Sequence, residues 1–158
     1  MSTFEKFSLV ALRLALGFLM LYAGVTKLAD PAWSAGGYLA GAKTFHGLYA
    51  FFASPAVLPA INVINEWGLT LLGVSLLLGI GVRLSGILGA LLMLLYYFPV
   101  LDFPVVAPHS YLVDEHIVYA AALLLLSAVR AGRVFGLEHW CTGLPVCRRF
   151  PRLPALVG

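Results

Sequence analysis

Two apolar runs lie back to back in residues 59–101, which read PAINVINEWGLTLLGVSLLLGIGVRLSGILGALLMLLYYFPVL. Each run approaches the roughly 20 apolar residues that a helix needs to cross a bilayer. Only a short stretch around Gly79, Gly81 and Arg83 separates them, and closely spaced glycines are typical of a tight turn. The segment therefore predicts a hairpin of two transmembrane helices, residues 59–82 and 84–101.

The rest of the chain has the same apolar character. Of its 158 residues, 61% are hydrophobic and 11% are charged, and the mean hydropathy of +0.96 lies outside the range of soluble domains. Residues 7–28 and 112–129 are predicted to form two further spans. We expect an all-α integral membrane four-helix bundle over residues 1–138. The apolar stretch of residues 7–28 is too long for a signal peptide and contains Arg13, so it is expected to remain as a membrane anchor.

Basic residues predict the orientation of the bundle. They gather in the N-terminal tail, the turn between the second and third spans, and the C-terminal region: Lys6, Arg83, Arg130, Arg133, Arg148, Arg149 and Arg152. The positive-inside rule assigns these three regions to the cytoplasm. The chain is thus predicted to be a multi-pass protein of the cytoplasmic membrane with both termini inside (N-in, C-in). Residues 30–58 and 102–111 then lie on the outer side.

The segment between the first two spans is aromatic, and the C-terminal tail is not predicted to be regular. Aromatic residues gather at membrane interfaces, so the segment is expected to lie in the outer interface, where it could cap a pocket. Its aromatic residues are Trp33, Tyr38, Phe45, Tyr49, Phe51 and Phe52. Residues 139–158 are expected to form an irregular cytoplasmic tail, where Cys141 and Cys147 face a reducing compartment and match no common metal-site spacing.

Two polar clusters stand at the starts of apolar runs: Asn65-Glu66-Trp67 and Asp114-Glu115-His116. Carboxylates are costly at membrane depth, roughly 2.5–3.5 kcal/mol on insertion scales, so they are rarely placed there without a partner or a task. The predicted topology brings both clusters to the outer side. The predicted proton-exchanging, catalytic residues are Glu66, Asp114, Glu115 and His116. Alternatively, the second cluster is only a helix start whose acids are stabilised by the helix dipole.

Helical phase extends this set to binding residues. At 100° per residue, Arg13, Gly17 and Lys27 share one face of the first helix, and Gly86, Met93 and Tyr97 share one face of the third. The predicted substrate- and quinone-binding residues are Arg13, Lys27, Asn65, Trp67, Tyr97 and Tyr119. For Arg13 the alternative is snorkelling to the headgroups, and for the glycines it is helix packing alone.

Several cofactor chemistries find no support in the sequence. No C-x-x-C pair or glycine-rich phosphate loop is present, and the histidines fall in loops or at helix ends: His46, His109, His116 and His139. We expect neither a haem nor a metal ion. We also expect no nucleic-acid partner. The remaining carboxylates, histidine, lysine and tyrosines suit a quinone, which needs hydrogen-bond partners for its ring oxygens and a route for protons.

Short motifs follow in a fixed order along the chain: Arg13-Leu14 with Gly17, Ala23-Gly24-x-x-Lys27, Asn65-Glu66-Trp67-Gly68 with Gly73, Arg83-Leu84-x-Gly86, Asp114-Glu115-His116 and Ala131-Gly132-Arg133. Over residues 7–138 they resemble the DoxX family, especially its DoxD-like branch, the membrane subunit of thiosulfate:quinone oxidoreductase, also labelled a terminal quinol oxidase subunit. The resemblance implies a four-helix protein of quinone-linked redox metabolism, in some members oxidising thiosulfate to tetrathionate. The polar site that it implies comprises Arg13, Lys27, Glu66, Asp114, Glu115 and His116.

Three functions remain open at this point. The first is a quinone-binding redox subunit with an outer polar pocket; because the chain has no separate soluble domain, a partner subunit would supply a thiosulfate-oxidising centre. The second is a non-catalytic accessory subunit of a larger respiratory complex. The third is a small proton-coupled carrier, which would need a homo-oligomer because four helices enclose little volume.

Overall fold

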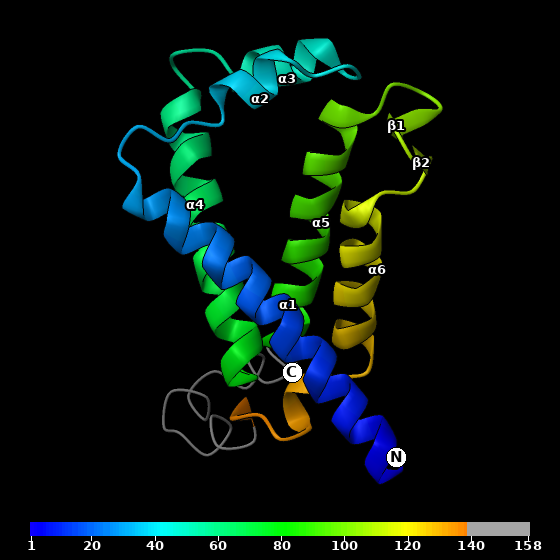
Figure 1. The fold of residues 1–158 in the computed structure, drawn as a ribbon. Helices are drawn as coiled ribbons and strands as arrows, with labels where there is room; N and C mark the ends of the chain where they lie inside the picture. Colours follow the sequence, from blue (N-terminus) through cyan, green and yellow to red (C-terminus); the bar gives the residue numbers. More distant parts are fainter. Residues whose placement is uncertain (139–158) are drawn as a thin grey trace.

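The computed structural model describes residues 1–138 and is largely helical (Figure 1). The predicted tail, residues 139–158 with Cys141 and Cys147, lies outside the described residues. In chain order the elements are α1 (Thr3–Ala29), α2 (Gly36–Ala40), α3 (His46–Phe52), α4 (Leu58–Leu78), α5 (Val82–Val100), β1 (Val105–Ala107), β2 (Ser110–Tyr111), α6 (Glu115–Ala128) and the 3₁₀ helix η1 (Ala131–Arg133).

Three helices are long and apolar enough to cross a membrane: α1 with 27 residues, α4 with 21 and α5 with 19. The chain is therefore a multi-pass membrane protein. The predicted fourth span, residues 112–129, is shorter in the structure, because α6 begins only at Glu115 and has 14 residues. At 1.5 Å per residue α6 is about 21 Å long, less than the roughly 30 Å of the hydrocarbon core.

The predicted hairpin is confirmed as α4, a short turn and α5. Gly79 and Gly81 both have positive φ, 67° and 70°, a conformation that glycine adopts without the steric cost of a Cβ atom. Ser75 Oγ donates to the Ile80 carbonyl and contacts Ser85 Oγ, both at 2.5 Å. These contacts link the two helices through their turn.

The helices pack as two pairs, α1 on α4 and α5 on α6. Small residues make the close approaches, as in many membrane helix interfaces. A Cβ atom on Gly73 would lie 2.6 Å from Leu21 Cα, and one on Gly86 would lie 2.6 Å from the Leu123 carbonyl oxygen. The predicted face of α5 is confirmed as buried, since Gly86, Met93 and Tyr97 are all inside.

The aromatic segment forms two short helices, α2 and α3, that lie across the ends of α4 and α5 (Figure 1). Pro99 has no N–H to donate to the Leu95 carbonyl of α5, and Tyr49 Oη donates to that carbonyl at 3.0 Å instead. Tyr38 Oη and Thr44 Oγ1 donate to the carbonyls of Tyr96 and Phe98. The segment therefore docks on carbonyls at the C-terminal end of α5.

One element departs from the all-α prediction. Residues 102–111, expected as a simple loop, contain the short antiparallel ribbon of β1 and β2. Val106 packs with Tyr97 and Leu101 in a small apolar cluster. The ribbon carries the chain from the end of α5 to the start of α6 (Figure 1).

At the opposite end, Arg13 is 2% exposed. Its Nη1 donates to the carbonyls of Ala131 at 2.7 Å and Val134 at 3.0 Å, and its Nη2 to that of Phe135 at 3.3 Å. The snorkelling alternative is thus wrong, because the guanidinium is buried against the segment that follows α6.

Candidate functional site

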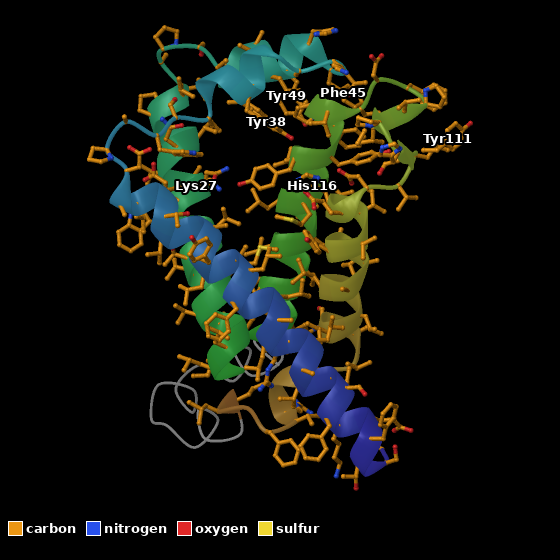
Figure 2. The ribbon with its side chains drawn as sticks, viewed as in Figure 1. Lys27, Tyr38, Phe45, Tyr49, Tyr111 and His116 are labelled. Carbon is orange, nitrogen blue, oxygen red and sulfur yellow. The ribbon has the colours of Figure 1, made fainter. Side chains whose placement is uncertain are left out.

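The helices leave a polar region at one end, where α1 finishes and α6 begins. We name it the Lys27 end; the opposite end, with Arg13, the α4–α5 turn and η1, is the Arg13 end. Figure 2 shows Lys27 on the α1–α4 side and His116 on the α6 side, with Tyr38 and Tyr49 above them.

Lys27 lies in the last turn of α1, where a positive charge meets the negative end of the helix dipole. Its Nζ sits 5.3 Å from the centre of the Trp33 ring, a cation–π contact. Glu66 of α4 is close enough for its charge to attract the Lys27 ammonium. The two opposite charges on α1 and α4 therefore act on each other, although no direct ion pair joins them within the described residues.

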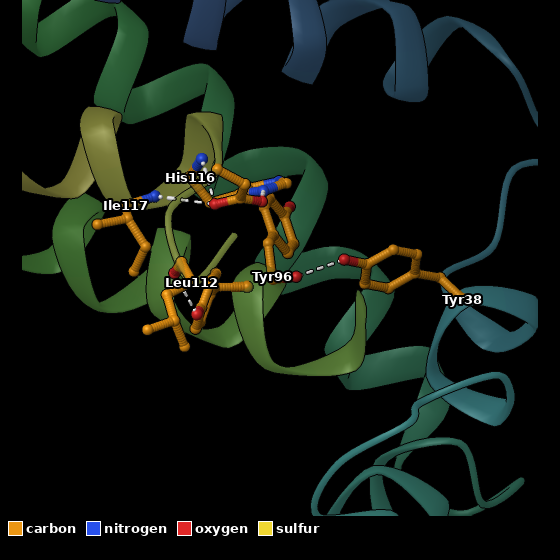
Figure 3. Close-up of polar contacts among 7 residues, drawn as sticks. Tyr38, Tyr96, Leu112, His116 and Ile117 are labelled. Carbon is orange, nitrogen blue, oxygen red and sulfur yellow. Dashed lines mark hydrogen bonds and ion pairs between the residues drawn. The ribbon is translucent and has the colours of Figure 1, made fainter. Parts of the chain in front are cut away.

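Asp114 and His116 form a compact unit at the start of α6. Figure 3 shows His116 there, near Ile117 and Tyr96. Asp114 is the N-cap: its Oδ1 accepts from the backbone N–H of His116 at 3.0 Å and of Ile117 at 3.2 Å. Its Oδ2 lies 2.6 Å from His116 Nδ1. The carboxylate thus favours the imidazole tautomer with a proton on Nδ1, which leaves Nε2 as the basic nitrogen. The helix-start interpretation holds for Asp114, and its second oxygen still orients the histidine.

Tyr38 and Tyr96 bring α2 to α5 at this end. The Tyr38 hydroxyl donates to the Tyr96 carbonyl, and the two rings meet edge to face at 6.3 Å between centroids (Figure 3). The Tyr96 ring also meets the His116 ring edge-on at 5.8 Å. Burial raises the pKa of Tyr38 to about 12, aided by nearby Tyr49 and Asp114. Tyr38 consequently stays a hydrogen-bond donor at neutral pH.

These side chains enclose a cavity of about 310 Å³, the Lys27–His116 pocket. Its lining residues are Lys27, Trp33, Ser34, Ala35, Tyr38, Asn65, Tyr96, Val100 and His116. Asn65 Oδ1 and Tyr96 Oη are buried and make no hydrogen bond of ordinary geometry within the described part of the chain, although the Asn65 side chain lies close enough to the Tyr96 hydroxyl to act on it. Burying a polar atom without a partner costs about 1–3 kcal/mol. A ligand that forms hydrogen bonds with both atoms would remove this cost.

A second, apolar compartment of about 240 Å³ adjoins the pocket. The two share four lining residues, Ala35, Tyr38, Asn65 and Tyr96. The remaining walls of the compartment come from Tyr49, Phe52, Leu39 of α2 and aliphatic residues of α4 and α5. A molecule in the pocket would therefore meet polar groups on one side and an apolar space on the other.

The structure brings together only part of the predicted site. Lys27, Asn65 and His116 line the pocket. Glu66 acts on Lys27 through its charge, and Asp114 contacts the His116 ring. The other predicted residues lie elsewhere: Arg13 at the Arg13 end, Trp67 and Glu115 exposed, Tyr97 bonded through its hydroxyl to the Leu112 carbonyl, and Tyr119 packed against the apolar core.

The direction of consecutive side chains on a helix explains why Tyr97 is not in the pocket. Consecutive helical residues point about 100° apart, so Tyr96 and Tyr97 cannot both face the pocket, and Tyr96 is the one that does. The pocket residues that the predicted set lacked are Trp33, Ser34, Ala35, Tyr38, Tyr96 and Val100. The aromatic composition of residues 33–52 was the signal for two of them, Trp33 and Tyr38, and the first part of this segment lines the pocket. Among residues 1–138, no group of three His, Cys, Asp or Glu side chains is arranged to hold a metal.

A family model, DoxX, matches residues 8–101, more than half of the chain. The chain belongs to the DoxX family. The match ends before α6, so Asp114 and His116 lie beyond it, and it names no branch of the family. No curated protein and no solved structure matches the chain.

Proposed function

We propose that this member of the DoxX family binds the head group of a quinone in the Lys27–His116 pocket. The observation that carries the proposal is the pair of buried, unpartnered atoms, Asn65 Oδ1 and Tyr96 Oη, on a pocket that continues into an apolar space. A quinone offers ring oxygens for such partners and a hydrophobic body for the apolar walls. A bound quinone would supply two-electron, two-proton redox chemistry.

His116 is the proposed proton-exchanging residue. With Asp114 on Nδ1, its Nε2 can take or give a proton, while Lys27 and Glu66 balance each other's charge near the pocket. General acid–base groups contribute a factor of about 10²–10⁴ to turnover, so His116→Ala should reduce quinone-linked turnover by that order. Glu115→Gln is the matched control because Glu115 is exposed. Near-normal turnover in His116→Ala would reject the role.

The electron donor belongs to a partner in this proposal. Two thiosulfate ions yield one tetrathionate ion and two electrons, which with two protons convert a quinone to a quinol. The oxidising centre itself is proposed to lie in a partner subunit of the respiratory membrane.

The pocket is proposed to open toward the non-cytoplasmic leaflet, from the positive-inside rule. Cysteines introduced at Ser2 and Ser110 test this orientation. We expect a membrane-impermeant thiol reagent added outside to label Ser110→Cys and not Ser2→Cys. The reverse pattern would place the pocket on the cytoplasmic side.

The binding test starts from protein purified gently in its native lipid. Extraction and mass analysis should find a quinone near one per chain, and Asn65→Leu should lower its occupancy. A neutral hydrogen bond is worth about 0.5–1.5 kcal/mol, or a factor of about 2–10 in affinity. Trp67→Leu is the control, because Trp67 is 52% exposed and outside the pocket. If the wild-type protein carries no quinone and binds none on titration, an accessory role takes the place of this proposal.

A further inference from the structure

We propose that the ligand of the Lys27–His116 pocket carries a long polyprenyl chain, which leaves the protein through a groove between α4 and α5. This inference rests on the proposed function and adds the part of the ligand that the head-group site does not hold. It assigns a second subsite, made of residues with no role in proton exchange.

The groove follows from how the helices pair. Because α1 packs on α4 and α5 on α6, the two inner helices of the hairpin touch each other less than their partners do. Between them lies a void of about 380 Å³, lined by apolar residues of both helices and by Ser85. Ser85 Oγ is already paired with Ser75 Oγ, so the groove has an apolar lining with no free hydroxyl.

The groove continues the pocket. It shares Ile64, Leu92 and Leu95 with the apolar compartment, which in turn shares Asn65 and Tyr96 with the pocket. The path therefore starts at the polar atoms and ends on side chains that face the bilayer, such as Leu71 and Leu91, which are 60% and 54% exposed. A head group in the pocket has this way out for its tail.

The size of the groove selects its occupant. Its wall on α5, from Leu84 to Leu95, is about 16 Å long, so about 380 Å³ corresponds to a cross-section of about 24 Å². The groove therefore has room for an extended hydrocarbon chain along its length.

Gly68 marks the middle of the groove. A Cβ atom built there would meet nothing within 4 Å, unlike the glycines at the helix contacts. The residue is therefore not required for packing between α4 and its neighbours. Its place on the groove wall keeps the path open, and a large side chain there would fill it.

The test compares quinones with the same head group and different tails. Full-length protein in nanodiscs is titrated with a quinone bearing one isoprene unit and with one bearing a long chain. We expect Gly68→Phe to weaken binding of the long-chain quinone at least about tenfold, equal to about 1.4 kcal/mol, and to change binding of the short one by less than about twofold. Leu88→Phe, from the facing wall, should repeat the pattern if Gly68→Phe fails to fold.

Val63→Phe is the matched control, since Val63 is an exposed residue of α4 outside the groove. If the groove variants bind both quinones as the wild type does, the tail path is wrong and the head-group proposal stands. If the wild type binds neither quinone, both proposals fail. A phospholipid that copurifies with the wild type and is lost from Gly68→Phe, with quinone binding unchanged, would also overturn the tail path.

Discussion

The two cations of α1 have opposite surroundings. Arg13 is buried, and its guanidinium donates to three carbonyls from one segment of the chain. Lys27 lies beside a cavity, held by the Trp33 ring and the charge of Glu66. Both ends hold buried atoms without a hydrogen-bond partner in the described residues: Arg13 Nε and Glu138 Oε2 at the Arg13 end, and Asn65 Oδ1 and Tyr96 Oη at the Lys27 end. The two ends differ because Asn65 and Tyr96 line a cavity, whereas Arg13 is packed against backbone carbonyls. The cavity is what makes the Lys27 end a candidate for binding.

The largest effect on stability is expected from removing the charge of Arg13. Arg13→Gln removes the charged donor of three carbonyls and one of the two cations near the buried Glu138 carboxylate, which keeps its ion pair with Arg133, and breaking a buried charged network costs about 3–5 kcal/mol. Thermal unfolding of the full chain in detergent should show a large drop in midpoint. Lys6→Gln, on the exposed N-terminal turn, is the control. Equal midpoints for the two variants would contradict the structural role of Arg13.

Glycines should separate the closed end from the open groove. Gly79→Ala places a Cβ atom 2.7 Å from Gly136 Cα at a residue with φ of 67°, and such overpacking costs about 1–3 kcal/mol. Gly68→Ala meets open space and should stabilise α4 by up to about 1 kcal/mol, because alanine favours helix. The same unfolding measurement checks both. A loss of stability in Gly68→Ala as large as in Gly79→Ala would remove the distinction.

Two adjacent tyrosines sharpen the comparison within the Lys27 end. The Tyr97 hydroxyl is bonded to the Leu112 carbonyl, so Tyr97→Phe should cost about 0.5–1.5 kcal/mol of stability and leave quinone binding unchanged. The Tyr96 hydroxyl has no partner within the described residues, so Tyr96→Phe should keep stability and weaken binding by a factor of about 2–10. Unfolding and quinone titration of both variants give the result. Exchanged outcomes would place Tyr97 in the site.

The smallest effect is expected at Tyr38 of α2, which covers the pocket. With its pKa raised to about 12, Tyr38 should remain protonated well above pH 10, and Tyr38→Phe should remove a late step from an absorbance titration of the tyrosines. Because the folded state holds this proton more tightly than the unfolded chain, stability should be constant below pH 10 and fall between pH 10 and about 12. A Tyr38→Phe protein with an unchanged titration curve would show that another tyrosine is responsible.

Much of the fold could be predicted because hydrophobic length and turn glycines are local signals. The hairpin of α4 and α5 and the buried face of α5 follow from such patterns. The end of α1 and the start of α6 were predicted to meet, and Lys27 and His116 do line one pocket. The predicted fourth span begins three residues later than expected, at Glu115, and the ribbon of β1 and β2 was missed, since a two-residue strand leaves a weak sequence signal.

By itself, the sequence determined that this chain enters a membrane and that its polar residues gather at helix ends, because burying apolar surface and avoiding bare charge depend on composition and spacing. Tertiary structure decided which residue of each neighbouring pair faces the pocket, since a rotation of 100° exchanges Tyr96 for Tyr97. It also decided the role of Arg13, whose carbonyl partner Ala131 lies 118 residues away. No local pattern records such a contact, because it forms only when α1, the α4–α5 turn and η1 have packed together.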